Sequence, residues 1–189
     1  KNGIFYSFCQ KAASDKKKKY FFIIDEINRG NMSKIFGELL MLIESDYRDT
    51  TLQLPFEIKK IRVPKNLFII GMMNTADRSL AMIDYALRRR FSFFSMKPGF
   101  ESEGFKEYQK VLNNDKFNAL INKIKELNAR INELLGSGFE IGHSYFCNQT
   151  QITDKWLHSV VNYDIIPMLE EYWFDNSDEV NKWRENLTK

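Results

Sequence analysis

Two acidic residues, Asp25 and Glu26, directly follow five continuous apolar residues, 20–24. A strand that is apolar on both faces is typical of the middle of a parallel sheet covered by helices. Such sheets bind ligands at the carboxyl ends of their strands. In phosphoryl-transfer sites one carboxylate there holds Mg²⁺, and a neighbouring group orients the attacking water. Asp25 fits the first role and Glu26 the second, although two solvated acids at a strand end would give the same pattern.

A second apolar run, residues 67–71, ends in a polar segment that contains Asn74. If the two predicted strands are neighbours, the Asn74 amide lies beside the same phosphate and its attacking water. A neutral donor and acceptor can hold that water without competing with Glu26 for charge. The alternative is that Asn74 is a turn residue or a helix cap.

Three consecutive arginines, Arg88, Arg89 and Arg90, stand between a predicted helix at 80–87 and a predicted third strand at 91–96. They cannot all lie in a core, so at least one must reach the surface. There it could meet the nucleotide of a neighbouring subunit and stabilise transition-state charge. The alternative is a surface basic cluster or a set of salt-bridge partners.

The elements that must position these residues are predicted from hydrophobic spacing and caps. Before the boundary at 97–99 the sequence predicts a mixed α/β region, and after it a helical region. The other elements expected in the first region are a helix at 5–13, a helix at 35–43 capped by Ser33, and a hairpin or an extended excursion over 47–63. The second region is expected to hold a helix over 117–135 stopped by Gly136, a loop and strand at 138–146, a helix over 157–172 kinked at Pro167, and a last helix with an Asn176–Glu179 capping box.

Composition sets limits on the class of protein. Apolar residues make up 43% of the chain and charged residues 28%, as in globular proteins, and no run is long enough to cross a bilayer. The net charge of +3 does not argue for nucleic-acid binding. Lys16 to Lys19 could touch phosphate, but a solvated turn ahead of a buried strand explains them better. Cys9 and Cys147 are expected to be reduced thiols. With no signal-peptide pattern, the expected location is cytoplasmic.

Four segments together resemble the McrB family, the AAA+ GTPases of modified-cytosine-dependent restriction systems. FFIIDEINRGN at 21–31 is similar to that family's Walker B region, and MNTADRS at 73–79 to its sensor 1 segment. IDYALRRRF at 83–91 resembles its arginine-finger segment, and GFEIGHSYF at 138–146 resembles a segment of its lid. The order is the expected one, and the segments span most of the chain.

The resemblance implies roles for individual residues. Asp25 would serve Mg²⁺, Glu26 would activate water and Asn74 would be sensor 1. The trans arginine fingers would come from Arg88, Arg89 and Arg90. Three residues in matching motif positions would support the site or the subunit contact: Asn28, Asp77 and Arg78. Two more would lie where a lid approaches the nucleotide: His143 and Ser144. For His143 a hydrogen-bonded structural role is an equal alternative.

The resemblance also implies an architecture and partners. Residues 1–97 would form part of a RecA-like AAA+ parallel sheet flanked by helices, and residues 98–189 a mainly α-helical lid. GTP (or ATP) would bind between subunits of a ring, expected to be a hexamer. Hydrolysis would drive DNA translocation with a McrC-like endonuclease, and the N-terminal modules that recognise modified DNA would lie outside this chain. No membrane partner is expected.

The chain departs from the family in one respect: it contains no Gly-x-x-x-x-Gly-Lys-Ser/Thr loop. The backbone cradle and the lysine that grip the β- and γ-phosphates are therefore missing. We interpret the chain as part of a longer subunit and expect it to fold but to hydrolyse little or no nucleotide by itself. Measurable GTP or ATP turnover by the purified chain would contradict this expectation.

Two other interpretations share parts of the pattern. A MoxR-type AAA+ ATPase that remodels proteins has similar strands, acids and arginines, and a preference for ATP over GTP in the full-length protein would favour it. A non-catalytic module would use the arginines and lid only for ring contacts. In that case replacing Glu26 by Gln would leave the turnover of the full-length protein unchanged.

Overall fold

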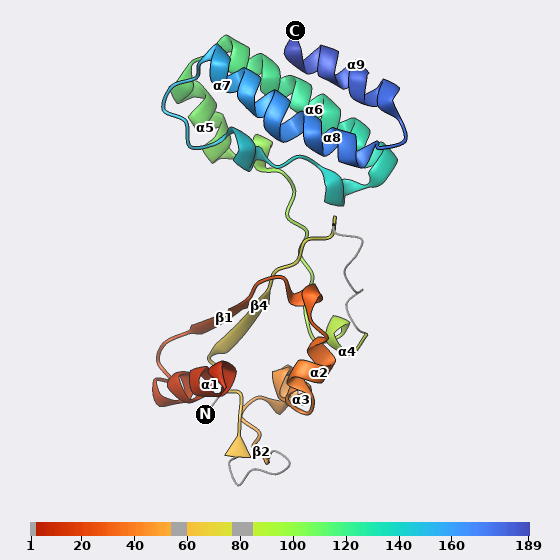
Figure 1. Ribbon diagram of the computed structural model, residues 1–189. Coiled ribbons are helices and arrows are strands. Elements are labelled where there is room, and N and C mark those ends of the chain that lie inside the picture. The colour runs from red at the N-terminus through yellow and green to blue at the C-terminus, as the bar shows by residue number, and fades with distance from the viewer. Residues whose placement is uncertain (1–2, 54–59, 77–84) are drawn as a thin grey trace. The chain divides into compact units, whose positions relative to one another are not determined.

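The structure is a computed structural model of the chain, and it describes residues 3–53, 60–76 and 85–189 (Figure 1). The chain divides into two compact units, Lys1–Phe94 and Ser95–Lys189. The first unit contains a parallel pair of strands with helices, and the second is helical. Each unit has its own buried apolar cores. No helix within the described ranges is both long and apolar enough to cross a membrane.

The two predicted strands form a parallel pair. Strand β1 (Tyr20–Ile24) lies beside β4 (Leu67–Gly71) over its whole length, from Tyr20 opposite Leu67 to Ile24 opposite Gly71 (Figure 1). Because parallel strands in register end at the same edge, the residues that follow Ile24 and Gly71 leave the sheet together. The predicted pairing is therefore confirmed.

Only one face of this pair is covered by the described residues. Helix α1 (Ile4–Ser14) packs Cys9 and Ala12 against the face that carries Phe22 and Ile69. Four apolar residues on the opposite face are each 42–58% exposed: Phe21, Ile23, Phe68 and Ile70. Phe21 and Phe68 stack there with their ring centroids 5.4 Å apart. The expectation that β1 is buried on both faces is thus wrong for the part of the chain described, because the helices of this unit cover one side.

The helix expected over 35–43 is two short helices. Helix α2 (Met32–Phe36) begins after Asn31, whose Oδ1 accepts a hydrogen bond from the Lys34 amide at 2.9 Å. Ser33, the predicted cap, lies inside α2. Gly37 ends α2 with φ +49° and ψ −126°, a conformation that side chains with a Cβ rarely adopt, and α3 (Leu39–Ile43) follows. Both helices contribute to a cluster around Ile27 and Leu87, whereas Leu42 of α3 is buried in the cluster around Cys9.

The hairpin is short, and the half-buried Arg48 forms hydrogen bonds to the segments next to it. Strands β2 (Leu52–Gln53) and β3 (Lys60–Ile61) pair antiparallel, as predicted; residues 54–59 lie outside the described part. Arg48 donates through Nε to the Ile43 carbonyl and through Nη1 to the Leu67 carbonyl, both at 2.9 Å. It thereby joins the end of α3 to the start of β4, and burial lowers its pKa. Burial likewise raises the pKa of the nearby Cys9 thiol to about 11.

Residues 91–96 do not form the predicted third strand. They have no regular structure, and Phe93, Phe94 and Met96 are 50%, 89% and 89% exposed. A strand needs a partner for its backbone hydrogen bonds, and residues 91–96 pair with neither β1 nor β4 in the described part. Just before this segment, helix α4 (Tyr85–Arg88) forms the end of the predicted helix at 80–87, of which residues 80–84 lie outside the described part.

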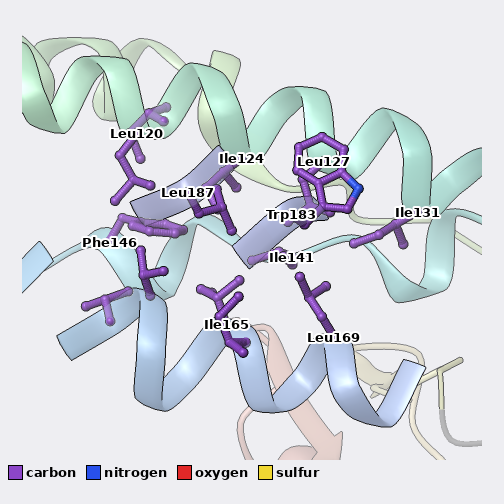
Figure 2. Close-up of a cluster of buried hydrophobic side chains, with 14 of the residues drawn as sticks. Leu120, Ile124, Leu127, Ile131, Ile141, Phe146, Ile165, Leu169, Trp183 and Leu187 are labelled. Atoms are coloured by element: carbon purple, nitrogen blue, oxygen red, sulfur yellow. The ribbon is translucent and has the colours of Figure 1, made fainter. Parts of the chain in front are cut away.

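The second unit is a bundle of helices around one core. Its helices are α5 (Glu103–Leu112), α6 (Asp115–Leu135), α7 (Asp154–Ser159), α8 (Ile166–Tyr172) and α9 (Ser177–Thr188). Helix α6 ends at Gly136 (φ +97°), as predicted. Figure 2 shows its apolar stripe facing α8 and α9, with Ile141 and Phe146 in the same core. The labelled residues of that stripe are Leu120, Ile124, Leu127 and Ile131.

The segment expected as a loop and strand at 138–146 contains no strand. It forms two 3₁₀ turns, Ser137–Phe139 and His143–Phe146. Between them the buried side chain of Asn128 receives the Ile141 amide on Oδ1 at 2.6 Å and donates from Nδ2 to the Ile141 carbonyl at 2.9 Å. One side chain on α6 thus supplies both hydrogen bonds that a neighbouring strand would have given.

The predicted kink at Pro167 takes the form of a π-helical turn. Residues Val160–Ile165 form this turn between α7 and α8, and Pro167 lies in the first turn of α8, where its missing amide is tolerated. The capping box of α9 forms only in part. Asn176 Oδ1 accepts from the Glu179 amide at 3.2 Å, but the Glu179 carboxylate instead pairs with Arg130 at 3.0 Å.

Candidate active site

The acidic pair leaves β1 at an irregular point in the parallel ladder. The Met72 amide donates to the Ile24 carbonyl at 2.9 Å, and the Ile27 amide donates to the Met72 carbonyl at 2.8 Å. In a regular parallel ladder the second bond would come from residue 26, so β1 carries one extra residue here. Asp25 and Glu26 therefore occupy a bulge held at both ends by the same residue of the neighbouring strand.

Glu26 has a left-handed backbone, with φ and ψ both 49°. A non-glycine residue in this region costs on the order of 1–3 kcal/mol, and such strain is concentrated at functional sites. The Glu26 amide donates to Asp25 Oδ1 at 2.9 Å, which orients the exposed Asp25 carboxylate. The Glu26 carboxylate forms an ion pair with the guanidinium of Arg29, one helical turn later. The bulge thus presents two carboxylates with separate partners.

Asn74 lies at the same edge, after β4. Its carbonyl accepts a hydrogen bond from Asn28 Nδ2 at 3.4 Å, and its Oδ1 accepts from the Ala76 amide at 3.0 Å. Asn28 belongs to the 3₁₀ turn Ile27–Arg29 that follows the acidic pair. The segments after the two strands are therefore joined by a hydrogen bond as well as by the ladder. Asp25, Glu26, Asn28 and Asn74, all predicted from sequence, are brought together in one place.

Asn28 also presents an acceptor without a donor in the described structure. Its Oδ1 is inaccessible to solvent and receives no hydrogen bond from residues 3–53, 60–76 or 85–189. An unsatisfied buried acceptor costs about 1–3 kcal/mol, so a donor brought by a ligand or an ordered water would be favourable here.

One glycine shapes this edge, and the sequence analysis gave it no role. A Cβ on Gly71 would stand 2.7 Å from Ile27 Cδ1, so a larger residue there would displace the turn that follows the acids. The signal in the sequence that could have identified Gly71 is a glycine at the end of an apolar run. Arg29, the partner of Glu26, was visible only as part of the FFIIDEINRGN segment.

The three arginines are separated by the fold. Arg88, the last residue of α4, and Arg89 are exposed. The Arg90 side chain is 9% exposed, and its Nη2 pairs with Glu44 Oε1 at 2.7 Å. Leu87, buried in the cluster around Ile27, anchors the segment. Arg88 and Arg89 can therefore reach a second molecule, whereas Arg90 is engaged within its own unit. Asp77 and Arg78, also candidates from sequence, lie outside the described residues.

The two candidates of the second unit differ in their environment. His143 Nδ1 accepts a hydrogen bond from the Gly99 amide at 3.0 Å, and its ring packs edge-on against Phe100 and Phe105. A Cβ on Gly99 would stand 3.0–3.2 Å from the imidazole ring, so this close packing requires glycine. His143 is thus hydrogen-bonded and packed within its own unit, and its contact with a nucleotide stays a prediction. Ser144 is exposed.

We call the edge of the sheet that carries Asp25, Glu26, Asn28 and Asn74 the acidic edge. Its oxygen atoms match only in part the ligands that a hard cation such as Mg²⁺ prefers. Across the described ranges no group of three or more His, Cys, Asp and Glu side chains is placed to hold a metal ion. Mg²⁺, however, is commonly bound by one or two carboxylates together with substrate phosphates and water. The exposed Asp25 carboxylate, with oxygen acceptors nearby on Asn28 and Asn74, fits that mode of binding and does not fit a metal cage formed by protein alone.

Comparison with known proteins matches the two units separately. Residues 2–91 match the AAA domain of the dynein-related subfamily, and residues 119–181 match the α-helical lid domain of McrB. These matches confirm the fold class expected from the sequence, an AAA+ sheet with helices followed by a helical lid. They also give the order of the two parts along the chain.

Two curated proteins are similar to the chain. It is 47% identical, over 99% of its length, to the type IV methyl-directed restriction enzyme EcoKMcrB subunit of Escherichia coli K12. It is 28% identical, over 82% of its length, to the type II restriction enzyme BsuMI component YdiS of Bacillus subtilis 168. The aligned regions cover 44% and 52% of those proteins, so the chain spans about half the length of the relatives it matches.

Proposed function

Because the chain belongs to the McrB family of AAA+ proteins, we propose that it supplies the Walker B, sensor 1, arginine-finger and lid parts of a nucleoside triphosphatase motor. In this proposal the substrate is GTP, and the subunits form a ring, expected to be a hexamer. The motor drives DNA translocation in a restriction complex with a McrC-like endonuclease. Modified DNA is recognised by modules outside this chain. The similarity to a methyl-directed restriction subunit supports this assignment.

The observation that carries the proposal is the joint placement of Asp25, Glu26 and Asn74 at one edge of the parallel pair. The ladder bonds to Met72 and the Asn28–Asn74 hydrogen bond hold them there. Asp25 would hold Mg²⁺, which when bound neutralises charge on the β- and γ-phosphates. Glu26 would accept the proton of the attacking water, and Asn74 would orient that water through its amide. Asn28 would offer its unused Oδ1 to the water shell.

The ion pair between Glu26 and Arg29 bears on the proton transfer. In the described structure the Arg29 guanidinium pairs with the Glu26 carboxylate. Glu26 would face the attacking water once the nucleotide or a neighbouring subunit draws Arg29 away. The proposed trans contacts come from the two exposed arginines, Arg88 and Arg89, rather than from the buried Arg90.

The chain by itself is expected to turn over little or no nucleotide. It contains no phosphate-binding loop, so no lysine and no backbone cradle would grip the β- and γ-phosphates. Phosphate release from GTP and from ATP by the purified 189-residue chain is the measurement. Turnover that scales with protein concentration and disappears in Glu26→Gln would contradict this expectation.

The proposed function is tested by Glu26→Gln in the full-length protein. The amide keeps the shape of the side chain but cannot accept the proton, so kcat should fall about 10²–10⁴-fold while GTP still binds. Glu38→Gln is the matched control, because Glu38 is an exposed carboxylate of the same unit at the start of α3. Unchanged kcat in Glu26→Gln would reject the motor and favour a non-catalytic ring module.

Nucleotide preference is tested separately in the full-length protein. Competition of GTP against ATP in the turnover assay should favour GTP. Preference for ATP would leave the roles of Asp25 and Glu26 in place but would favour a MoxR-type ATPase over the proposed GTPase.

A further inference from the structure

The amino-terminal edge of the parallel pair carries a dense group of positive charges. Lys16, Lys17, Lys18 and Lys19 form the turn between α1 and β1, and Lys65 lies two residues before β4. All five side chains are exposed. The Tyr20 amide donates to the Asn66 carbonyl at 2.8 Å, so the two segments lie side by side. We call these five lysines the basic edge.

The turn that carries the basic edge is held in one conformation by Asn66. Its Nδ2 lies 2.9 Å from the Ala12 carbonyl, 3.0 Å from the Asp15 carbonyl and 2.9 Å from the Lys18 carbonyl. The Asp15 carboxylate accepts the Lys17 amide at 3.3 Å. The backbone is thus bonded internally while the lysine side chains extend into solvent, and binding through them would not need to order the turn.

Charge in this turn is poorly balanced. Asp15 is the single carboxylate between residues 11 and 19, and it pairs with Lys18 at 3.3 Å. Neighbouring like charges repel one another, so four consecutive lysines raise the free energy of the turn. The solubility of the protein does not require four lysines side by side. A polyanion would relieve this repulsion.

Further positive charge lies along a shallow groove near the same end of α1. The groove has a volume of about 560 Å³ and lies between α1 and the hairpin. Ser14, immediately before the lysine turn, lines it together with Lys60 and Arg62. Positive charge therefore continues from the basic edge toward the hairpin, which suits an extended anion better than a single phosphate group.

We propose that the basic edge binds the phosphodiester backbone of DNA without sequence preference. Ammonium groups act on phosphates as point charges and read no base identity. The choice of DNA as the polyanion rests on the proposed function, but the binding itself does not depend on hydrolysis. The basic edge and the acidic edge lie at opposite ends of β1, a strand of five residues that spans roughly 13–16 Å. DNA bound at one end would therefore leave the nucleotide site free.

The test is fluorescence anisotropy of the 189-residue chain with a labelled duplex of about 20 bp, without nucleotide, over a salt series. If four or five phosphates are neutralised, log Kd should change with log salt by a slope of about 4. Affinity should then fall about 250-fold between roughly 50 and 200 mM NaCl. Duplexes rich in A·T and in G·C should bind equally.

Two quadruple variants separate a local site from overall charge. Changing Lys16, Lys17, Lys18 and Lys19 to Gln should remove most of the salt dependence and weaken binding at low salt by tenfold or more. The control variant changes four exposed lysines of the second unit to Gln: Lys110, Lys116, Lys155 and Lys182. It lowers the net charge from +3 to −1, as the first variant does, and should leave the affinity for DNA within about twofold. Circular dichroism verifies that both variants are folded, and a quadruple Lys→Arg variant of the turn should bind like the original.

Three results would overturn the proposal. The first is absence of binding at about 50 mM salt, and the second is equal weakening by the two quadruple variants. The third is binding to vesicles of anionic lipid with no binding to DNA. Failure of Glu26→Gln to reduce hydrolysis would reject the motor function but would leave this binding measurement unaffected, so the two proposals fail independently.

Discussion

At the scale of single residues, the acidic edge depends on one additional residue in β1. Because Ile24 and Ile27 both bond to Met72, the two acids between them cannot continue the extended strand, and Glu26 takes a left-handed backbone. Consecutive residues of a regular strand point to opposite faces, whereas a bulge allows both carboxylates to emerge near the strand end. The local strain and the chemistry of the pair therefore have the same origin.

The three arginines give a prediction at this scale. In the full-length protein, Arg88→Ala or Arg89→Ala should lower kcat by about 10³–10⁵-fold if that residue is the trans finger, with little change in stability. Arg90→Ala should lower the free energy of unfolding by about 1–3 kcal/mol, because it leaves Glu44 without its charged partner. Steady-state turnover and thermal unfolding of the three variants separate these effects.

Two results would contradict the division of roles among the arginines. One is an Arg90→Ala protein with unchanged stability and lost turnover, which would make Arg90 a finger despite its burial. The other is normal turnover in the Arg88→Ala, Arg89→Ala double variant. Mixing either inactive variant with Glu26→Gln subunits should restore activity, because a finger and a base on different subunits can complement each other.

At the scale of elements, Gly37 decides how the segment after the acids is folded. The break at Gly37 separates α2, which contributes Met32 and Phe36 to the cluster around Ile27, from α3. Helix α3 contributes Leu40 and Ile43 to that cluster and Leu42 to the cluster around Cys9. The packing beneath the acidic edge thus depends on a residue free to adopt φ +49°.

Gly37→Ala should therefore destabilise the first unit by about 1–2 kcal/mol, through backbone strain rather than a clash, because a Cβ at this position meets open space. Gly104→Ala is the matched control. It also meets open space but lies in α5, where alanine should stabilise the helix by about 0.5–1 kcal/mol. Chemical denaturation measures both changes. A neutral Gly37→Ala would show that the break has another cause.

The helices of the second unit are tied to each other by polar contacts as well as by the core. Arg130 of α6 pairs with Glu133 at 2.8 Å and with Glu179 of α9 at 3.0 Å. These hydrogen bonds raise the pKa of Arg130. Burial raises the pKa of Glu179, but the hydrogen bonds from Arg130 and Trp183 outweigh it, so the net pKa is lowered. The pair therefore favours docking of α9 above the pH at which Glu179 titrates, and this contribution is lost at acid pH.

At the scale of the whole molecule, each unit contains the core that it needs. Residues 95–189 bury a cluster that runs from Phe100 to Leu187, and Figure 2 shows part of it. Asn128 holds the segment around Ile141 in place. An independent lid is consistent with the separate matches of the two family domains.

Residues 95–189 expressed alone should therefore fold into a helical domain with a cooperative thermal transition. Asn128→Ala should destabilise this domain by about 2–4 kcal/mol, because the Ile141 amide and carbonyl lose their partner. Asn132→Ala, at an exposed position of the same helix, should have little effect. Circular dichroism measures each transition. A non-cooperative transition in the unmodified domain would contradict its independence.

The sequence by itself determined the elements whose signals are local. Continuous apolar runs predicted β1 and β4, the polar residues after them predicted a shared edge, and Gly136 predicted the end of α6. The motif segments predicted the family, which the comparisons confirmed. Each of these inferences needs only spacing, caps and the fact that parallel strands end together.

Tertiary structure decided the features that depend on partners distant in the chain. Residues 91–96 have the composition of a strand but pair with neither β1 nor β4 in the described part, and Arg90, unlike the exposed Arg88 and Arg89, pairs with Glu44. Asn128 looks like any polar helix residue until Ile141 packs against it. A sequence states which hydrogen-bonding and charged groups a segment carries, but their partners are set by packing between segments, and the partner determines what each group does.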